Sequence, residues 1–392
     1  MKKILTGLFV ILCIAGTILL RLYTVDRNVA QKTIEPPVLT ETSEATEPEV
    51  KEPEKSEVTV LSMGDIIFHQ ATYLNFKDAE GNYDFTHFFK EMEEEYKDKL
   101  VVGNFETTVN PERKISGFPM FNTPATAVTA IKNAGIDVLT TANNHCIDTG
   151  SRGIATTIEE IEKNGIEHTG TFTNPDQRGG IIVSRKGINI GILAYSEMFN
   201  GNDAGLKRED LYMINPLNEE KITADIKELR DKGADFIVVY PHFGIEYSFT
   251  PSNTQKYWTE YILNAGADMV VGSHPHVPQK AEILNINGEN KLAVYSLGNF
   301  ISNQREDNIG KKLTEVGTVL EFTLEKEGEK TKVVSALLKP VYTYRFRNES
   351  GIWEYNAVLL DNLLNKTEDP NLKQRLINLK TDWENVVEMT SW

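Results

Sequence analysis

Apolar and polar positions alternate in blocks along most of this chain, and the pattern becomes regular near residue 58. From there on, short apolar segments typical of buried strands alternate with segments whose apolar residues recur every three or four positions, as on a helix face. The first strand is expected at 58–63. Helices are expected at about 85–97, 124–134, 151–164, 218–231 and 253–265. This alternation predicts an α/β fold class.

Capping signals mark the ends of two of these helices. Thr123 and Pro124 form a good N-cap and first-turn pair. Gly135 and Gly165 stand where a left-handed residue commonly ends a helix.

Three segments share one layout: a helix end, a glycine, an aspartate, an apolar strand and then a histidine. They are residues 131–145, 229–242 and 262–274. Uncharged strands between helices indicate a parallel sheet covered on both faces, and such sheets bind ligands beyond the carboxyl ends of their strands. The need to end a helix and begin a strand can explain why the glycine and the aspartate recur in all three segments. It does not explain why a histidine follows each strand.

The N-terminus predicts a location outside the cytoplasm. Lys2 and Lys3 precede an apolar run at 4–20, which Arg21 closes. We expect residues 1–25 to be an uncleaved signal-anchor that crosses the cell membrane once and leaves the bulk of the chain extracytoplasmic. A cleaved signal peptide is the alternative.

Residues 26–57 have the composition of a tether. Between residues 35 and 57 there are eight Glu, two Lys and four Pro. Because like charges repel and proline stiffens the backbone, this acidic linker is expected to be extended and unfolded.

Overall composition narrows the function classes. The 392 residues carry a net charge of −16, which argues against a nucleic-acid partner because such a protein needs a basic face. The two cysteines, Cys13 and Cys146, are too few for a disulfide framework within the folded body.

Side chains that could bind metal or take part in catalysis follow the predicted strands. Five strand ends carry carboxylate, amide or imidazole groups: Asp65, then Asn104 and Glu106, then Asn144 and His145, then His242, and finally His274 and His276. Mixed oxygen and nitrogen ligands suit divalent metal ions such as Mn, Fe or Zn, in a number that the sequence does not fix. A pair of ions could clamp both oxygens of a displacement at phosphorus.

Each of these residues also has a purely structural explanation. A buried histidine can simply be hydrogen-bonded in the core, and Asn144 can stabilise a turn through its side chain. Asp65 can cap the segment that follows it.

Six motifs occur in the order expected of a known family: Gly64-Asp65-Ile66, Asn104-Phe105-Glu106, Ala142-Asn143-Asn144-His145, His242-Phe243-Gly244-Ile245-Glu246-Tyr247, Gly272-Ser273-His274-Pro275-His276 and Tyr295-Ser296-Leu297-Gly298-Asn299-Phe300. Over residues 58–345 the chain resembles the CapA family of bacterial capsule (poly-γ-glutamate) synthesis proteins. That family is in turn similar to the calcineurin-like metallophosphatases. The resemblance implies a metallophosphatase-like two-sheet α/β sandwich.

The resemblance also implies roles for individual residues. The metal ligands it implies are Asp65, Glu106, Asn144, His242, His274 and His276. His145 resembles the acid that protonates the leaving group. His69, Asn104, Glu246 and Asn299 are expected around the ligands or near the substrate.

Two positions depart from the metallophosphatase pattern. Ile67 stands where a ligand histidine is usual, and the nearest imidazole is His69. Asn104 replaces the bridging aspartate, so Glu106 would have to supply that carboxylate. One metal ion and an altered pair are both compatible with these departures.

The function expected from the resemblance is capsule or poly-γ-glutamate biosynthesis or export at the cell surface. Its partners would be the membrane, an anionic polymer such as poly-γ-glutamate, and membrane synthase subunits. One alternative is a non-catalytic organiser that binds polymer or synthase. Another is an exported metal-dependent phosphoesterase unrelated to capsule, because fold does not fix substrate.

The tail at 346–392 is expected to be a helical extension that docks on the domain. One apolar stripe at helical spacing predicts this contact, formed by Leu372, Leu376, Leu379, Trp383 and Val387.

Overall fold

The computed structural model describes residues 55–177, 179–389 and 391–392. The predicted signal-anchor and nearly all of the predicted linker lie outside these residues. Within the described part, no helix has both the length and the hydropathy that crossing a bilayer requires.

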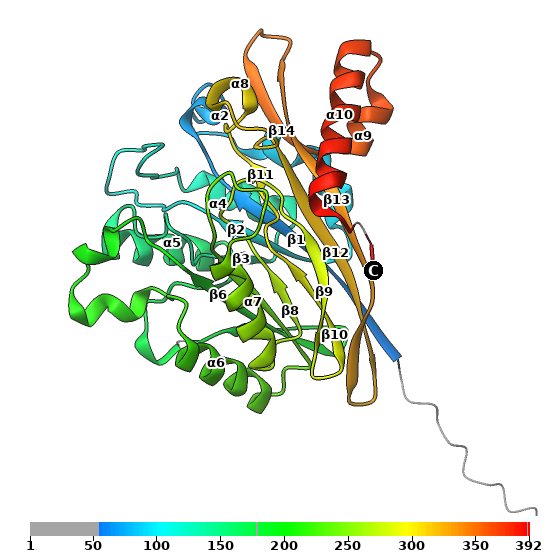
Figure 1. The fold of residues 1–392 in the computed structure, drawn as a ribbon. Coiled ribbons are helices and arrows are strands. Elements are labelled where there is room, and N and C mark those ends of the chain that lie inside the picture. The colour runs from blue at the N-terminus through cyan, green and yellow to red at the C-terminus, as the bar shows by residue number, and fades with distance from the viewer. Residues whose placement is uncertain (1–54, 178, 390) are drawn as a thin grey trace, which may run out of the picture. The chain divides into compact units, whose positions relative to one another are not determined.

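The described chain is a mixed α/β fold with two sheets (Figure 1). The eight strands of the first sheet are β1 (Lys55–Ile66), β2 (Leu100–Phe105), β3 (Val138–Thr140), β4 (Glu167–Thr169), β11 (Asn299–Ile301), β12 (Val316–Glu327), β13 (Lys330–Arg347) and β14 (Trp353–Leu359). The six strands of the second sheet are β5 (Ile181–Arg185), β6 (Ile188–Ser196), β7 (Phe236–His242), β8 (Met269–Val271), β9 (Ala281–Ile286) and β10 (Glu289–Val294).

Parallel pairing is confined to the middle of each sheet. In the first sheet, the order is β14-β13-β12-β1-β2-β3-β4, with β11 also beside β1. Strands β1 to β4 and β11 are parallel, whereas β12, β13 and β14 are antiparallel. In the second sheet, β6, β7, β8 and β10 are parallel, and β5 and β9 are antiparallel at the edges. The predicted parallel sheet is therefore the central part of two mixed sheets.

The central strands are buried on both faces. Val60 of β1 and Val238 of β7 belong to one core between the sheets, whereas their neighbours Leu61 and Ile237 belong to outer cores. This alternation explains why the strands are apolar at nearly every position.

Helices cover the outer face of each sheet. Those packed on the first sheet include α4 (Thr126–Ala134) and part of α5 (Gly150–Lys163), and those on the second sheet are α6 (Glu219–Asp231) and α7 (Asn253–Asn264). The shorter helical elements are α2 (Gln70–Tyr73), η1 (Thr86–Phe88), η2 (Lys90–Met92), α3 (Glu93–Tyr96), η3 (Pro175–Gln177), η4 (Asn202–Gly205), η5 (Arg208–Met213), α8 (Glu306–Ile309) and α9 (Leu360–Lys366).

The helix expected at 85–97 is wrong, because this stretch is broken into η1, η2 and α3. Phe85 and Phe88 are buried, as a single helical face would predict, but His87 is buried as well. Its ring stacks on Phe76 with centroids 4.2 Å apart. The segment therefore packs on two sides, which a regular amphipathic helix does not do.

The capping expectations are confirmed at the helix ends and wrong at the start of α4. Gly135 and Gly165 have φ of 99° and 65°, as left-handed C-terminal residues should. Thr123 does not cap α4, which begins after Ala125. Its hydroxyl instead lies 2.7 Å from the hydroxyl of Thr107.

The aspartate of each repeated segment fastens the start of its strand to the neighbouring strand. Each carboxylate accepts a backbone N–H, from Val101 to Asp137 (3.0 Å), from Asn189 to Asp235 (2.8 Å) and from Ile237 to Asp268 (2.7 Å). The repeated glycine and aspartate are thus explained by the fold.

The tail contains a strand that its helical pattern did not predict. β14 lies wholly within 346–392 and forms the edge of the first sheet. Helix α10 (Pro370–Val387) follows, and it buries Leu376, Trp383 and Val387 in the core between the sheets. The indole N–H of Trp383 donates to Thr318 Oγ1 at 2.8 Å, so α10 is fastened to β12.

Candidate metal centre

The predicted site residues meet where the parallel strands of both sheets end. β1 and β2 are paired so that Asp65 lies opposite Asn104, and β11 places Asn299 on the other side of Asp65. The second sheet contributes groups from the end of β7 and from the loop after β8. The six candidate ligands each expose 3% or less of their surface, and they are Asp65, Glu106, Asn144, His242, His274 and His276.

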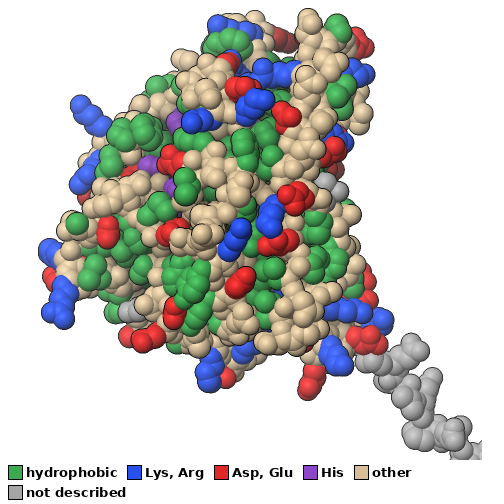
Figure 2. Space-filling view, in the orientation of Figure 1, with side chains coloured by type: hydrophobic (Ala, Val, Ile, Leu, Met, Phe, Trp, Pro, Cys, Tyr) green, Lys and Arg blue, Asp and Glu red, His purple; other side chains and the backbone are tan. Residues whose placement is uncertain are grey.

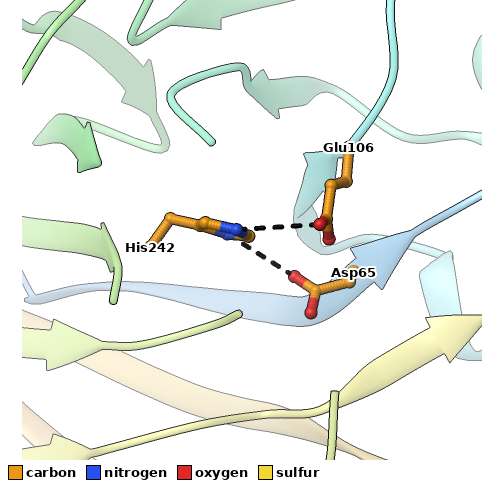
Figure 3. Close-up of side chains that lie close together, drawn as sticks. All are labelled: Asp65, Glu106 and His242. Carbon is orange, nitrogen blue, oxygen red and sulfur yellow. Dashed lines mark ion pairs between the residues drawn. The ribbon is translucent and has the colours of Figure 1, made fainter. Parts of the chain in front are cut away.

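Three of these residues form the middle of the cluster. Ligand atoms of Asp65, Glu106 and His242 all lie within 4.8 Å of one another (Figure 3). His242 Nε2 is 3.7 Å from Glu106 Oε1, and its Nδ1 is 3.9 Å from Asp65 Oδ1. The imidazole therefore lies between the two carboxylates, with one nitrogen toward each.

The other candidate ligands surround the Nε2 side of His242. Asn144 Oδ1 lies 2.8 Å from this nitrogen, and His274 Nδ1 lies 3.2 Å from it. His276 Nε2 is 3.7 Å from Glu106 Oε1. Atoms that share one ion at bond lengths of ~2.1 Å lie about 3 Å from their neighbours, so these separations fit a common metal ion.

The two buried carboxylates differ in their hydrogen bonds. Asp65 accepts from Asn104 Nδ2 at 2.7 Å, from the backbone N–H of His274 at 3.3 Å and from His276 Nδ1 at 3.1 Å. Both oxygens of Glu106 are buried, and neither has a hydrogen-bond partner among the described residues. A carboxylate in this position is satisfied only by a proton or a cation.

Burial is the main cause of the pKa shifts in the centre. It raises the pKa of Glu106 well above its usual range, and the nearby Asp65 charge adds to the effect. Burial also lowers the pKa of His242 well below its usual range and that of His274 to about 3, with the neighbouring histidines contributing. Both imidazoles are therefore neutral at pH 7, as a metal ligand must be.

His145 is held at the rim of the cluster with one ring nitrogen occupied. Its Nδ1 lies 2.7 Å from Asp148 Oδ2, and that oxygen also accepts the backbone N–H of Phe121 at 2.6 Å. Asn202 Nδ2 contacts the other oxygen of Asp148 at 3.3 Å. Phe121 packs edge-on against the imidazole. This arrangement fixes the ring through Nδ1 and its face, and it does not engage Nε2.

The residues expected around the ligands have different surroundings. Asn299 Oδ1 lies 3.1 Å from His276 Nδ1, so it orients that ring. His69 Nδ1 accepts the backbone N–H of Asn303 at 3.1 Å, and its ring packs edge-on against Phe121, as that of His145 does. Burial lowers the pKa of His69 to about 3, and the nearby His276 adds to the effect. Glu246 lies exposed on the loop after β7.

Sequence reasoning missed three residues that support the centre. They are Asn143, Asp148 and Ser273. Ser273 Oγ lies 3.1 Å from His242 Nδ1 and can accept its proton when Nε2 keeps its lone pair for a ligand. The position of Asp148, one helical turn after His145, was the only available signal among them.

Histidine side chains reach the surface at neighbouring points of one face, among hydrophobic, uncharged and charged groups (Figure 2). Exposed apolar residues occur on the loops that follow two of the strands of the site. Phe118 after β2 is 75% exposed, and Ile245 after β7 is 61% exposed.

Similarity to known proteins identifies the family of this chain. The profile described as "Bacterial capsule synthesis protein PGA_cap" matches residues 59–304. "Capsule biosynthesis protein CapA" of Bacillus anthracis is 28% identical over 263 residues, which cover 65% of this chain and 62% of the relative. "PGA biosynthesis protein CapA" of Bacillus subtilis is 29% identical over 233 residues, 58% of each chain. The matched part therefore spans about three fifths of the length of these relatives.

Solved structures with a similar arrangement are more distant. The NAD nucleotidase of Haemophilus influenzae has a TM-score of 0.49 at 12% identity, covering 84% of this chain and 63% of the other. The calcineurin-like phosphoesterase YfkN of Bacillus subtilis has a TM-score of 0.43 at 15% identity, covering 86% and 100%. The profile match covers more than half of the sequence, and the chain accordingly belongs to the family of bacterial capsule synthesis proteins.

Proposed function

We propose that this chain works in the synthesis or export of an anionic capsule polymer such as poly-γ-glutamate. Its metal-dependent centre would cleave a bond in the substrate or transfer a group from it. Family membership supports the capsule role. The observation that carries the metal-dependent role is Glu106, whose two buried oxygens lack any hydrogen-bond donor in the described chain.

The residues present fit a divalent metal ion. Glu106, Asn144, His242, His274 and His276 offer two oxygen and three nitrogen ligands on the Nε2 side of His242. Such a mixed set favours Mn, Fe or Zn over Ca or Mg, which prefer oxygen ligands alone. Asp65 belongs to the same cluster.

The chemistry would come from a divalent cation held by these residues and from His145. Such a cation would polarise an ester, phosphoester or amide and lower the pKa of bound water. His145 donates a proton from Nε2 to the leaving group, while Asp148 holds Nδ1 and keeps the ring in place. The loops after β2 and β7 present apolar side chains that can contact the uncharged part of a substrate.

The location is part of the proposal. Residues 1–25 would anchor the chain in the cell membrane, and residues 26–57 would separate the folded domain from it on the extracytoplasmic side. The expected partners are the polymer and membrane synthase subunits. Protease added to intact protoplasts should digest the domain, and protection of the domain would contradict this orientation.

Complementation tests the proposed function. A capsule-forming host that lacks its own relative of this chain would receive the wild type, His145→Ala or Glu106→Gln, with immunoblots to match expression. We expect the wild type to restore surface polymer and both variants to fail. Restoration by both variants would overturn the catalytic role.

That same outcome would support a second candidate function, a non-catalytic organiser that binds polymer or synthase subunits. The observation favouring it is the closure of the centre: Asp65 and Glu106 are fully buried, and His145 is only 6% exposed. A polymer would need the loops around the centre to move before it could reach the ligands. An organiser would need only the outer surface.

A further inference from the structure

The side-chain amide of Asn104 lies inside the centre, on the Nδ1 side of His242. Its nitrogen donates to Asp65 Oδ1 at 2.7 Å and lies 3.2 Å from His242 Nδ1. It also reaches Ser273 Oγ at 3.4 Å. The amide is 5% exposed, so water does not replace these contacts.

The orientation of this amide is fixed by the groups around its oxygen. Asn104 Oδ1 accepts from Thr140 Oγ1 and from Asn143 Nδ2, both at 3.3 Å. A flipped amide would place its oxygen against the Asp65 carboxylate and its NH2 against another NH2 group. The nitrogen therefore points into the centre.

We propose that the Asn104 amide takes the place of a second cation, so that the centre holds a single metal ion on the Nε2 side of His242. This inference rests on the proposed function, because it presumes that the centre binds metal. Two-metal sites place their ions about 3.5–4 Å apart, with side chains shared between them. Here the space between Asp65 Oδ1 and His242 Nδ1 is filled by the amide nitrogen.

The two carboxylates on either side of His242 agree with this assignment. On the amide side, both oxygens of Asp65 already have donors. On the opposite side, Glu106 has none. Asp65 then acts as a positioning residue that holds His276 Nδ1 and the backbone of His274, while Glu106 contributes the free carboxylate.

Metal counting on the purified full-length chain tests the inference. The chain would be prepared without chelator, loaded with excess Mn(II), freed of unbound ions, and analysed by mass spectrometry for metal and by electron paramagnetic resonance. We expect a ratio of about one ion per chain, where a two-metal centre would give about two. The spectrum should be that of isolated Mn(II). An exchange-coupled pair would overturn the inference and leave the proposed function standing.

Asn104→Asp tests the role of the amide directly. It puts a carboxylate against Asp65, and two carboxylates at that distance share a proton or a cation. With Mn(II) in excess at pH 8, we expect the ratio to rise toward about two and the coupled spectrum to appear. Asn253→Asp adds the same charge at an exposed position of α7, outside the centre, and should stay at one ion.

The results distinguish a failure of the inference from a failure of the proposed function. If Asn104→Asp, folded by circular dichroism, stays at one ion, the amide does not stand in for a cation and the inference fails. If the wild type binds no Mn, Fe or Zn, the metal-dependent function fails first and the inference fails with it.

Discussion

Polar groups at the two ends of the same parallel strands have opposite surroundings: those at the starts are half-buried and paired, and those at the ends are fully buried. At the starts, Asp235 and Asp268 each accept a backbone N–H from the neighbouring strand and pair with a cation, Lys326 or Arg230. At the ends, Glu106 is buried without a donor and His242 is crowded by other imidazoles. A polar group with a complete set of partners stabilises the fold, whereas a buried one without partners is available to bind a ligand.

This contrast separates the two halves of the repeated sequence pattern. The glycine and the aspartate recur because each strand needs the same turn and the same anchor to its neighbour. The histidine recurs at the opposite end, where it has no common structural partner: His145 contacts Asp148, and His242 contacts Ser273 and Asn144. The histidines therefore share a position at the strand ends without sharing a structural partner.

The largest expected effect comes from Glu106→Gln at the ligand end. We expect Mn(II) affinity to fall by at least ~100-fold, because ligands matter more than the outer contacts that cost 10–100-fold. The metal-free protein should become more stable at pH 8, since a buried group that resists ionisation is replaced by a neutral one. Calorimetric titration and urea unfolding measure the two effects. A loss of stability with affinity retained would reverse our assignment.

Asp148→Asn sharpens the account of His145. The amide no longer favours the tautomer that keeps Nε2 available, so turnover should fall by about 10²-fold while the metal content is unchanged. The pH–rate profile should also shift. Asn202→Ala is the matched control, because it removes the weaker contact to Asp148, together with a contact to the Met120 sulfur, and should change turnover less than about tenfold. Equal losses in both variants would contradict a specific role for Asp148.

Asp268→Ala tests the opposite end of a strand. It removes the acceptor of the Ile237 N–H and the partner of Arg230, which should cost about 1–3 kcal/mol of unfolding free energy. Because the change lies at the other end of β8, Mn(II) binding should keep its wild-type affinity. A variant that is stable but metal-free would mean that the two ends are not separate.

A further expected effect is a change in the pH dependence of stability. His69 is neutral in the folded chain down to pH about 3, while the unfolded chain protonates it below pH about 6.5. Stability from this group is therefore present above pH 6.5 and is lost as the pH falls toward 3. Relative to His69→Gln, the wild type should lose up to about 1.4 kcal/mol per pH unit between pH 6 and 4. If the unfolding free energies of the two proteins changed with pH in the same way, His69 would not be held neutral in the folded chain.

Much of the fold could be predicted from the sequence, since its signals are local. The apolar strands, α6, α7 and the glycine caps follow from periodicity and backbone preference. The break at 85–97 could not be predicted, because it depends on His87 packing against Phe76. β14 was missed because its pairing with β13 is decided by tertiary contact.

The candidate site, too, could be predicted only in part from the sequence. Strand-end positions predict that Asp65, Glu106 and His242 converge, and the structure brings them together. Their binding of metal stays a prediction. The hydrogen bonds of Asp148, Ser273 and the Asn104 amide depend on side-chain orientation across separate loops. No spacing in the sequence encodes which oxygen of Asp65 is occupied or that Glu106 is left without a donor.

The most direct test is thermal unfolding of the metal-free full-length chain with and without Mn(II), beside Glu106→Gln. A ligand that binds only the folded state at one hundred times its Kd adds about 2.7 kcal/mol of stability. We predict that Mn(II) raises the midpoint of the wild type by several degrees and leaves that of Glu106→Gln unchanged. An unchanged wild type, or an equal rise in both proteins, would contradict a metal centre built on the unpartnered carboxylate.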